Sequence, residues 1–253
     1  MIHLSGLVIT YNEEHNIERC LSSLWKVCDE VIVIDSNSND QTREIALKLN
    51  SKVIINPFPG HIEQKNFAVS KASHDYVLSI DADEELSDEL VKQIQKFKRS
   101  VNADALKFNR VTRYVDQWIY HCDWYPDTKL RLWKKELGKW GGVNPHDIVQ
   151  ISKEAKVIKL KGDLRHYSYN SISEHIQQTD KFTTIAAKAA YNNGVRSSIF
   201  KIVTRPFLKF LKDYFLRLGI LDGKYGFIIC YINSLSALLK YSKIKDLQDG
   251  KQI

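Results

Sequence analysis

The stretch "DYVLSIDADEEL", residues 75–86, joins a short apolar run to four acidic side chains. The run at 75–80 is rich in large apolar residues and has the length of a buried strand. The carboxylates of Asp81, Asp83, Glu84 and Glu85 follow within five positions and repel one another unless a cation lies among them. The stretch therefore predicts a buried strand that ends at a charged site.

The same unit, an apolar run followed by a helical pattern, recurs through the first hundred residues. Apolar runs occupy residues 4–10, 30–35, 52–56 and 75–80, and helical patterns occupy about 13–25, 40–49 and 62–72. Such alternation predicts an α/β fold: a mostly parallel sheet built by right-handed crossovers, with helices on both faces. Ligands of such sheets collect at the carboxyl ends of the strands, where "TYNEE", "DSNSNDQT" and "DADEE" lie.

After residue 86 the pattern changes. Residues 87–98 predict an amphipathic helix with Ser87 as its N-cap, and residues 173–193 predict another that stops at Gly194. Between them lie strand-like pieces at 104–111, 129–135 and 155–162, with a Trp- and Gly-rich loop at 138–147. We therefore predict one α/β domain over residues 1–194 and a separate tail over 195–253.

The tail carries the basic excess of the chain. Residues 195–253 hold 11 of the 37 Lys and Arg but only 4 of the 30 Asp and Glu, so the net charge of +7 lies there. We predict two helices, one at about 206–218 with Pro206 in its first turn and an apolar one at about 227–239. A basic amphipathic helix beside an apolar one favours binding to an anionic membrane surface. The alternatives are packing on the domain or a dimer contact.

The cysteines and the N-terminus indicate the compartment. Cys20, Cys28, Cys122 and Cys230 show no C-x-x-C spacing, so we expect reduced thiols. The first residues show no basic segment before a long apolar stretch, and no apolar run reaches the roughly 18 residues of a spanning helix. We therefore expect a cytoplasmic protein.

Within the acidic cluster, spacing separates the candidate ligands. Asp81 and Asp83 lie two apart and so point the same way on an extended chain, where they can converge on Mg²⁺ or Mn²⁺ with phosphate oxygens. Glu85 and Asp88 fit the first turn of the next helix, and Glu84 stays unassigned between the two groups. The alternative is that all these acids merely begin that helix.

Asp35 ends the second strand, where a carboxylate can accept hydrogen bonds from a base or ribose. Ordinary turn chemistry is the alternative, and it is the expected role of Asp40 as a helix cap. No Gly-rich phosphate loop follows any of these strands, which argues against a P-loop or dinucleotide-binding protein.

Together these residues resemble a known family. "VITYNEE" (8–14), "VIVIDSNSNDQT" (31–42), "QKNFAVSKASHDYVLSIDADEEL" (64–86), "RLWKK" (131–135) and "GGVNPHD" (141–147) look like family 2 inverting glycosyltransferases of GT-A fold. More narrowly, the chain is similar to the bacterial subgroup that includes lipopolysaccharide-core β-glucosyltransferases, the tail segment "LGILDGKYGF" included.

The resemblance implies roles residue by residue. The nucleotide pocket would be lined by Thr10, Tyr11, Glu13 and Asp35. Lys65 would approach the nucleotide or its diphosphate, Asp81 the ribose or metal, and Asp83 would be the direct metal ligand. Asp147 would be the catalytic base, at a position where relatives often have Glu. Residues 1–100 would then form the nucleotide-binding half, 101–172 the acceptor-side half and 173–194 a closing helix.

Three further residues have two open interpretations each. His146 either has a site role, by orienting Asp147 or touching a phosphate, or packs on Trp140. Arg131 either reaches a substrate or pairs with Asp127. His166 either supplements the metal or diphosphate site or is structural. The aromatics of the 118–125 segment can stack on sugars, but core packing is the usual role of such side chains.

The function that the resemblance implies is metal-dependent, inverting transfer of a hexose from a nucleotide sugar, expected to be a UDP-sugar, to a glycan or glycolipid acceptor. We expect this transfer to serve lipopolysaccharide or other cell-surface polysaccharide synthesis, with the enzyme peripheral on the inner face of the bacterial cytoplasmic membrane. One alternative is a sugar nucleotidyltransferase, which would need a Gly-rich N-terminal loop that "TYNEEHN" (10–16) does not have. Another is a catalytically silent binding module recruited by the tail. We expect no nucleic-acid partner, because only the pI of about 9.0 suggests one.

Overall fold

The computed structural model describes residues 1–143 and 146–253. The chain forms two compact units. Unit 1 comprises residues 1–111 and 127–167, and unit 2 comprises residues 112–126 and 168–253. The predicted division of the chain at residue 194 falls within unit 2 and stays a prediction about its functional parts.

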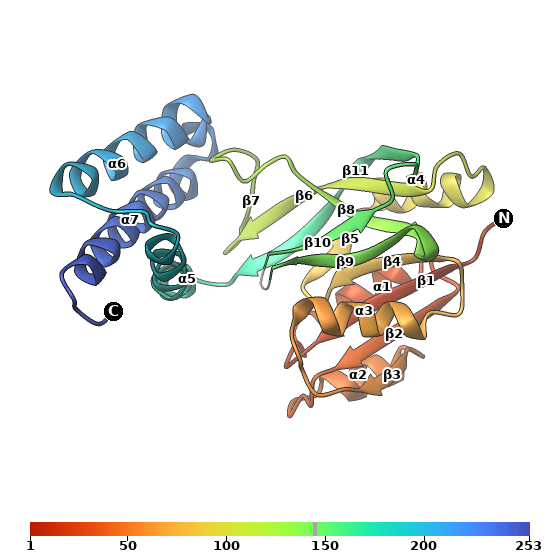
Figure 1. Ribbon diagram of the computed structural model, residues 1–253. Coiled ribbons are helices and arrows are strands. Elements are labelled where there is room, and N and C mark those ends of the chain that lie inside the picture. Colours follow the sequence, from red (N-terminus) through yellow and green to blue (C-terminus); the bar gives the residue numbers. More distant parts are fainter. Residues whose placement is uncertain (144–145) are drawn as a thin grey trace. The chain divides into compact units, whose positions relative to one another are not determined.

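Unit 1 begins with the predicted parallel sheet. Strands β1 (Leu4–Thr10), β2 (Glu30–Asp35), β3 (Lys52–Ile55) and β4 (Tyr76–Asp81) pair in the order β3-β2-β1-β4, all parallel. The intervening helices are α1 (Ile17–Leu24), α2 (Thr42–Lys48) and α3 (His61–Lys71), and α1 and α3 cover opposite faces (Figure 1). In this register Thr10 pairs with Asp35, and Ile9 with Asp81. The carboxyl ends of three strands therefore lie side by side, as predicted.

Alternating side chains of these strands fill two cores, one on each face of the sheet. Leu4 and Val8 of β1 pack in a core with α1, α2 and α4 (Asp88–Arg99), while Leu7 packs in the other core with α3. Helix α4 begins where the sequence predicts, because the Ser87 hydroxyl accepts a hydrogen bond from the Leu90 N–H. Burial on both faces explains why the centres of β1, β2 and β4 are mainly apolar.

Antiparallel strands extend this sheet on the β4 side. They are β5 (Glu84–Leu86), β6 (Ala105–Tyr114), β8 (Asp127–Lys134) and β11 (Val157–Tyr169), in the order β4-β8-β6-β11-β5. The predicted loop at 138–147 is wrong for most of its length. After a short 3₁₀ turn at Lys135–Leu137, β9 (Gly138–Val143) and β10 (His146–Ile151) pair antiparallel, with Asp147 opposite Gly142.

Unit 2 is mainly helical. It contains β7 (Gln117–Ile119), α5 (Ile172–Asn192), α6 (Ile199–Leu211), a π-helical turn (Lys212–Leu216), a 3₁₀ turn (Gly219–Asp222) and α7 (Gly223–Gln248). Helix α7 packs on α5 and α6, and its Lys243 pairs with Asp180 of α5 at 2.7 Å. Within the described ranges, no helix combines the length and apolar character needed to cross a bilayer.

Four predicted helix boundaries are wrong, each for a local reason. The first helix begins at Ile17 rather than near residue 13, because Asn12 has a positive φ of 55° and residues 13–16 form a turn. Helix α2 begins at Thr42 rather than near residue 40, with Gln41 at the N-cap position. The Asp40 carboxylate still accepts the Thr42 N–H, at 3.0 Å.

The two tail helices also differ from the prediction. Helix α6 begins at Ile199, where the Ser198 hydroxyl caps it, so Pro206 lies inside the helix rather than in its first turn. Helix α7 spans Gly223–Gln248, well beyond the predicted 227–239, because its polar last turns pair with α5 through Lys243. The hydrophobicity of the sequence predicts only the apolar centre of α7 and not its polar last turns.

Candidate active site

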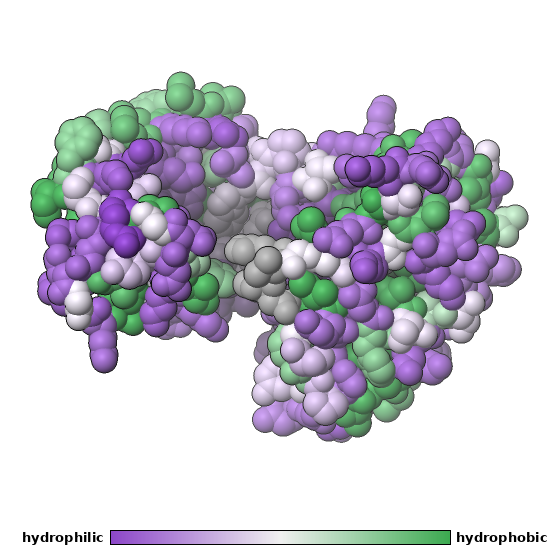
Figure 2. Space-filling model, in the orientation of Figure 1, coloured by the Kyte–Doolittle hydropathy of each residue, from purple (hydrophilic) through white to green (hydrophobic). Residues whose placement is uncertain are grey.

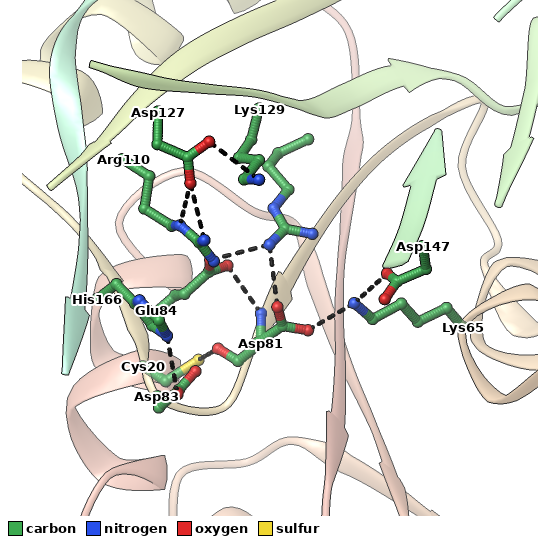
Figure 3. A network of polar contacts seen from close by, with 11 residues as sticks. Cys20, Lys65, Asp81, Asp83, Glu84, Arg110, Asp127, Lys129, Asp147 and His166 are labelled. Atoms are coloured by element: carbon green, nitrogen blue, oxygen red, sulfur yellow. Dashed lines mark hydrogen bonds and ion pairs between the residues drawn. The ribbon is translucent and has the colours of Figure 1, made fainter. Parts of the chain in front are cut away.

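The site lies at the carboxyl end of β4, in unit 1, and is organised around Asp81 (Figure 3). The two carboxylate oxygens of Asp81 each contact a buried cation: Oδ1 lies 2.7 Å from Lys65 Nζ, and Oδ2 lies 2.9 Å from Arg131 Nη2. Burial acts to raise the pKa of Asp81, but Lys65 and Arg131 outweigh it and hold the pKa well below its usual range. Asp81 is therefore a fixed anion between two protein cations.

Lys65 links Asp81 to the candidate base. Its ammonium, on α3 and only 3% exposed, also lies 2.7 Å from Oδ2 of Asp147 on β10 and 4.3 Å from the centre of the Trp140 ring. The structure thus brings together two carboxylates that are 66 positions apart, as the resemblance implied. The side chain of His146 is outside the described part of the structure, so its predicted role stays open.

Strand β9, which pairs with the strand that carries Asp147, is held to α3 by reciprocal hydrogen bonds. The Asn66 side chain donates to the Trp140 carbonyl at 2.9 Å and accepts from the Trp140 N–H at 3.0 Å. The Trp140 ring is buried and packs edge-to-face on Trp133, with centroids 5.9 Å apart. The position of Asp147 relative to Lys65 is thereby fixed through backbone contacts.

Asp83 lies apart from this pair of cations. Its Oδ2 contacts the imidazole Nε2 of His166, on β11, at 3.1 Å, and its side chain is 27% exposed. Of the two interpretations of His166, the contact with Asp83 places it beside the predicted metal ligand. Among the side chains that the structure describes, no three or more from His, Cys, Asp or Glu converge as a complete metal centre.

The donor set at Asp83 nevertheless fits a divalent cation. Mg²⁺ and Mn²⁺ sites of phosphate-transferring enzymes use one or two carboxylates and take their other ligands from substrate and water. Burial raises the pKa of the nearby Glu13, a hydrogen bond from Asn16 lowers it, and the negative charges of Asp83, Asp40 and Asp81 raise it further. This region is therefore negatively charged where a cation would bind.

Glu84, which the sequence left unassigned, is fully buried. Its Oε2 accepts the Asp81 N–H at 3.0 Å, and its Oε1 accepts from Arg131 at 2.9 Å and from Arg110 at 3.2 Å. Of the two interpretations of Arg131, pairing with Asp127 is not what the structure shows: Arg131 contacts Asp81 and Glu84, and Arg110 contacts Asp127 at 2.8 Å. Spacing could not distinguish two arginines on neighbouring antiparallel strands.

The loops after β1 and β2 are joined by hydrogen bonds beside this site. Asp35 is fully buried and accepts from both the backbone and the hydroxyl of Ser38, whose hydroxyl in turn accepts the Asn12 N–H at 2.9 Å. In this structure Asp35 therefore makes the turn contacts that were the alternative to nucleotide binding. The Glu13 N–H donates to the Thr42 hydroxyl at 2.8 Å, which ties the two loops together again.

Two of the predicted pocket residues, Thr10 and Tyr11, have groups that the described protein contacts leave available. The ring of Tyr11 is 58% exposed, and the buried Thr10 hydroxyl has no hydrogen-bond partner within the described residues. A buried hydroxyl with no partner loses free energy unless a ligand or water supplies one. Thr10, Tyr11, Glu13 and Asp35 all lie at the ends of β1 and β2, as predicted.

Comparison with known proteins identifies the family to which this chain belongs. The glycosyl transferase family 2 model matches residues 5–154, which contain all the residues named above except His166. The chain belongs to glycosyl transferase family 2. It is therefore a glycosyltransferase, and its α/β sheet is the expected GT-A fold with a C-terminal helical extension.

Relatives match nearly the whole chain. An uncharacterized glycosyltransferase of Rickettsia typhi is 33% identical over 98% of this chain and 88% of its own length. The lipopolysaccharide core biosynthesis glycosyltransferase LpsC of Rhizobium meliloti is 28% identical over 95% of this chain and 91% of its own. A solved structure of Staphylococcus aureus TarS, residues 1–349 in complex with UDP, aligns over 99% of this chain and 92% of its own with 16% identity and a TM-score of 0.49.

Proposed function

We propose that this family 2 glycosyltransferase moves a hexose from a UDP-sugar to a glycan or glycolipid acceptor, with inversion and with the help of a divalent cation. The acceptor class is that of lipopolysaccharide or another cell-surface polysaccharide, which the likeness to LpsC supports. The observation that carries the proposal is the placement of Lys65 between Asp81 and Asp147 at the carboxyl end of the parallel sheet.

The donor would occupy the ends of β1, β2 and β4. Thr10 and Tyr11 would contact the nucleotide, Glu13 and Asp35 would shape its pocket, and Asp81 would face the ribose or the metal. Lys65 is suited to the diphosphate, because its ammonium is buried, fixed by two carboxylates and adjacent to the predicted cation site. A preorganised cation of this kind stabilises charge that develops on a leaving group.

Asp83 would hold Mn²⁺ or Mg²⁺, with Asp81 as the second carboxylate of the D-x-D pair. When bound, such an ion neutralises the diphosphate as it departs. Asp147 would take the proton of the acceptor hydroxyl as that oxygen attacks the anomeric carbon from the side opposite the nucleotide. A single displacement of this kind inverts the configuration and uses no covalent nucleophile.

The test is release of UDP from a panel of UDP-sugars, with and without Mn²⁺. We expect Asp83→Ala to remove the Mn²⁺-dependent rate, whereas Asp88→Ala, at an exposed position in the same acidic segment, should retain it. Asp147→Asn should lower sugar transfer about a hundredfold or more while Mn²⁺–UDP still binds. Undiminished activity of Asp83→Ala would contradict the metal assignment, and no UDP release by the unaltered protein would favour a silent binding module.

We further propose that residues 195–253 hold the enzyme at the anionic inner face of the bacterial cytoplasmic membrane. Phe200, Val203 and Phe207 lie on one side of α6 and are 62–75% exposed. Figure 2 shows hydrophobic side chains gathered along the edge of unit 2 that α6 and the following turns form. Exposed large apolar residues also occupy those turns: Phe215, Leu216, Leu218, Ile220 and Leu221.

Basic residues accompany this apolar surface. The α6 segment and its following turns carry Lys201, Arg205, Lys209, Lys212 and Arg217. Apolar side chains that enter the headgroup region, flanked by lysine and arginine, are the two components of interfacial binding to anionic lipid. A lipid-linked acceptor would then be met at high local concentration.

Sedimentation with vesicles tests this proposal. Phosphatidylglycerol vesicles should bind the protein and phosphatidylcholine vesicles should bind it weakly. The double variant Phe200→Ser/Phe207→Ser should lose most of the binding, while Leu47→Ser, at an equally exposed apolar position on α2 of unit 1, should not. Unchanged binding by the double variant, or a dimer that the same variant dissociates, would contradict a membrane role for this surface.

A further inference from the structure

Seven side chains of unit 1 form a chain of alternating charge. In order they are Asp127, Arg110, Glu84, Arg131, Asp81, Lys65 and Asp147, and each contacts the next (Figure 3). The six contacts measure 2.8, 3.2, 2.9, 2.9, 2.7 and 2.7 Å. The candidate base Asp147 stands at one end, so its surroundings depend on residues far from it in sequence.

Glu84 is the most buried member of this chain. Its side chain is 0% exposed, whereas those of Asp81 and Asp127 are 30% and 33% exposed. Taking a carboxylate out of water is costly unless cations and hydrogen-bond donors replace its hydration. Here two guanidinium groups and the Asp81 N–H do so.

Glu84 contacts Asp81 in two ways. One oxygen binds the Asp81 backbone, and the other binds Arg131, whose same Nη2 atom contacts the Asp81 carboxylate. The backbone and the side chain of Asp81 are therefore both held by groups that Glu84 fixes. Arg131 is itself only 4% exposed and faces the Trp140 ring at 5.4 Å, so it can move little.

The neighbouring acid has different partners. Glu85 accepts from the Tyr167 hydroxyl at 2.7 Å and lies 3.7 Å from Arg165, both on β11. Adjacent residues on an extended chain point to opposite sides, which separates Glu84 from Glu85 despite their identical chemistry. Glu85 is thus a matched control for the charge and size of Glu84.

We propose that Glu84 is a positioning residue for sugar transfer: it holds Arg131 against Asp81, and so keeps Lys65 placed between Asp81 and Asp147. This inference rests on the proposed function, because it assigns Asp81, Lys65 and Asp147 to the donor and acceptor sites. Glu84 acts through these side chains and contacts no substrate. Its loss should therefore affect the step in which charge develops more than it affects binding of the donor.

The test compares Glu84→Gln with Glu85→Gln. For Glu84→Gln we expect kcat for UDP-sugar turnover to fall about a hundredfold, with KM and the Kd of Mn²⁺–UDP within about threefold of the original values. Glu85→Gln should stay within about twofold in kcat, since the contacts of Glu85 are with Tyr167 and Arg165 on β11 and not with Asp81, Lys65 or Asp147. Titration calorimetry with Mn²⁺ and UDP gives the Kd independently of activity.

A double-mutant cycle tests whether Glu84 acts through Arg131. Because the two residues would act as one unit, Glu84→Gln/Arg131→Met should be no more than about threefold slower than the slower single variant. Should Glu84→Gln fail to fold, Arg131→Lys carries the test: it keeps the buried charge but loses the planar group that joins Asp81 to Glu84, and its kcat should fall in the same way.

The outcomes separate the two proposals. Equal kcat for the Glu84 and Glu85 variants, multiplying losses in the double variant, or full activity of Arg131→Lys would overturn the positioning role alone. If the unaltered protein neither binds Mn²⁺–UDP nor releases UDP from any UDP-sugar, the proposed function fails and the positioning role fails with it.

Discussion

The two units treat charge and apolar surface in opposite ways. Unit 1 buries charged side chains at the end of β4, where Lys65, Glu84 and Arg131 are all less than 5% exposed. Unit 2 leaves phenylalanine and leucine side chains of α6 and its following turns in solvent, with Leu216 78% exposed. Each arrangement is unfavourable for folding alone, since buried charges lose hydration and exposed apolar groups retain theirs.

The difference indicates which kind of ligand or surface each unit is suited to bind. Buried charges with fixed partners form a rigid polar site that need not reorganise when charge develops on a substrate. An exposed apolar face with basic neighbours gains free energy only when another surface covers it. The first arrangement suits chemistry on a small polar donor, and the second suits attachment to an interface.

Removing Lys65 should break the arrangement in unit 1 most strongly. In Lys65→Met, Asp81 keeps only Arg131 and Asp147 loses its cation, so transfer should fall about a thousandfold. Unfolding free energy should also fall, by roughly 3 kcal/mol, because buried carboxylates lose a partner. Enzyme assays and urea titration measure both quantities.

Lys71 supplies the control for that prediction. It lies on the same helix, in its last turn, and its ammonium rests over the Phe67 ring at 4.6 Å. Lys71→Met should change stability by no more than about 0.5 kcal/mol and leave the rate unaltered. Equal effects of the two substitutions would mean that Lys65 contributes no more than any lysine of α3.

His175 tests whether unit 2 tolerates a buried charge. Burial lowers the pKa of His175 to about 4, from about 6.5 in an unfolded chain, and its Nδ1 lies 3.1 Å from the Tyr114 hydroxyl. Between these values the unfolded state binds the extra proton, so stability should fall as pH drops from about 6.5 to about 4, by up to ~3 kcal/mol.

Urea titrations at pH 7 and pH 4.5 measure that loss. His175→Gln should be less stable than the original protein at pH 7 but lose less on acidification. His15→Gln, at a position where the side chain is 91% exposed, should retain the full pH dependence. An identical pH dependence for His175→Gln would show that unit 2 accepts the imidazolium without penalty.

The smallest expected effect on stability comes from substitutions at the exposed apolar face of α6 in unit 2. Phe200→Ser/Phe207→Ser should change the free energy of unfolding by less than about 1 kcal/mol, because both rings are already in solvent. Ile229→Ala, at a fully buried position of α7, should cost about 2–4 kcal/mol. Thermal unfolding measures both, and a large loss in the double serine variant would show that α6 packs more tightly than its exposure indicates.

Much of unit 1 follows from its sequence. Apolar runs that end in polar clusters predicted the parallel strands, and the D-x-D spacing separated Asp83 from Glu85. Spacing alone could not reveal the role of Glu84, because its partners Arg110 and Arg131 come from antiparallel strands whose register depends on tertiary pairing. The β9–β10 pairing was missed for a related reason: glycines and a proline indicate a loop, while the pairing itself is non-local.

The tail was harder to predict. Its basic excess and apolar residues are evident in the sequence, but a proline favours a helix start at 206, whereas the Ser198 hydroxyl caps α6 well before that proline. The exposure of Phe200 and Phe207 could not be derived from periodicity, because an apolar stripe looks the same whether a neighbouring helix or solvent faces it. Only the packing of α7 on α5 and α6 shows which stripe is left uncovered.

The contact between Asn66 and Trp140 constrains how this enzyme can vary. The Asn66 amide donates one hydrogen bond to the backbone of residue 140 and accepts another from it. The identity of the side chain at 140 is therefore irrelevant to both bonds. A substitution at 140 can alter the ring contacts of Lys65 and Arg131 without losing the link between α3 and β9. A substitution at 66, in contrast, has no compensating change at 140, so the ring at 140 can vary while the asparagine stays fixed.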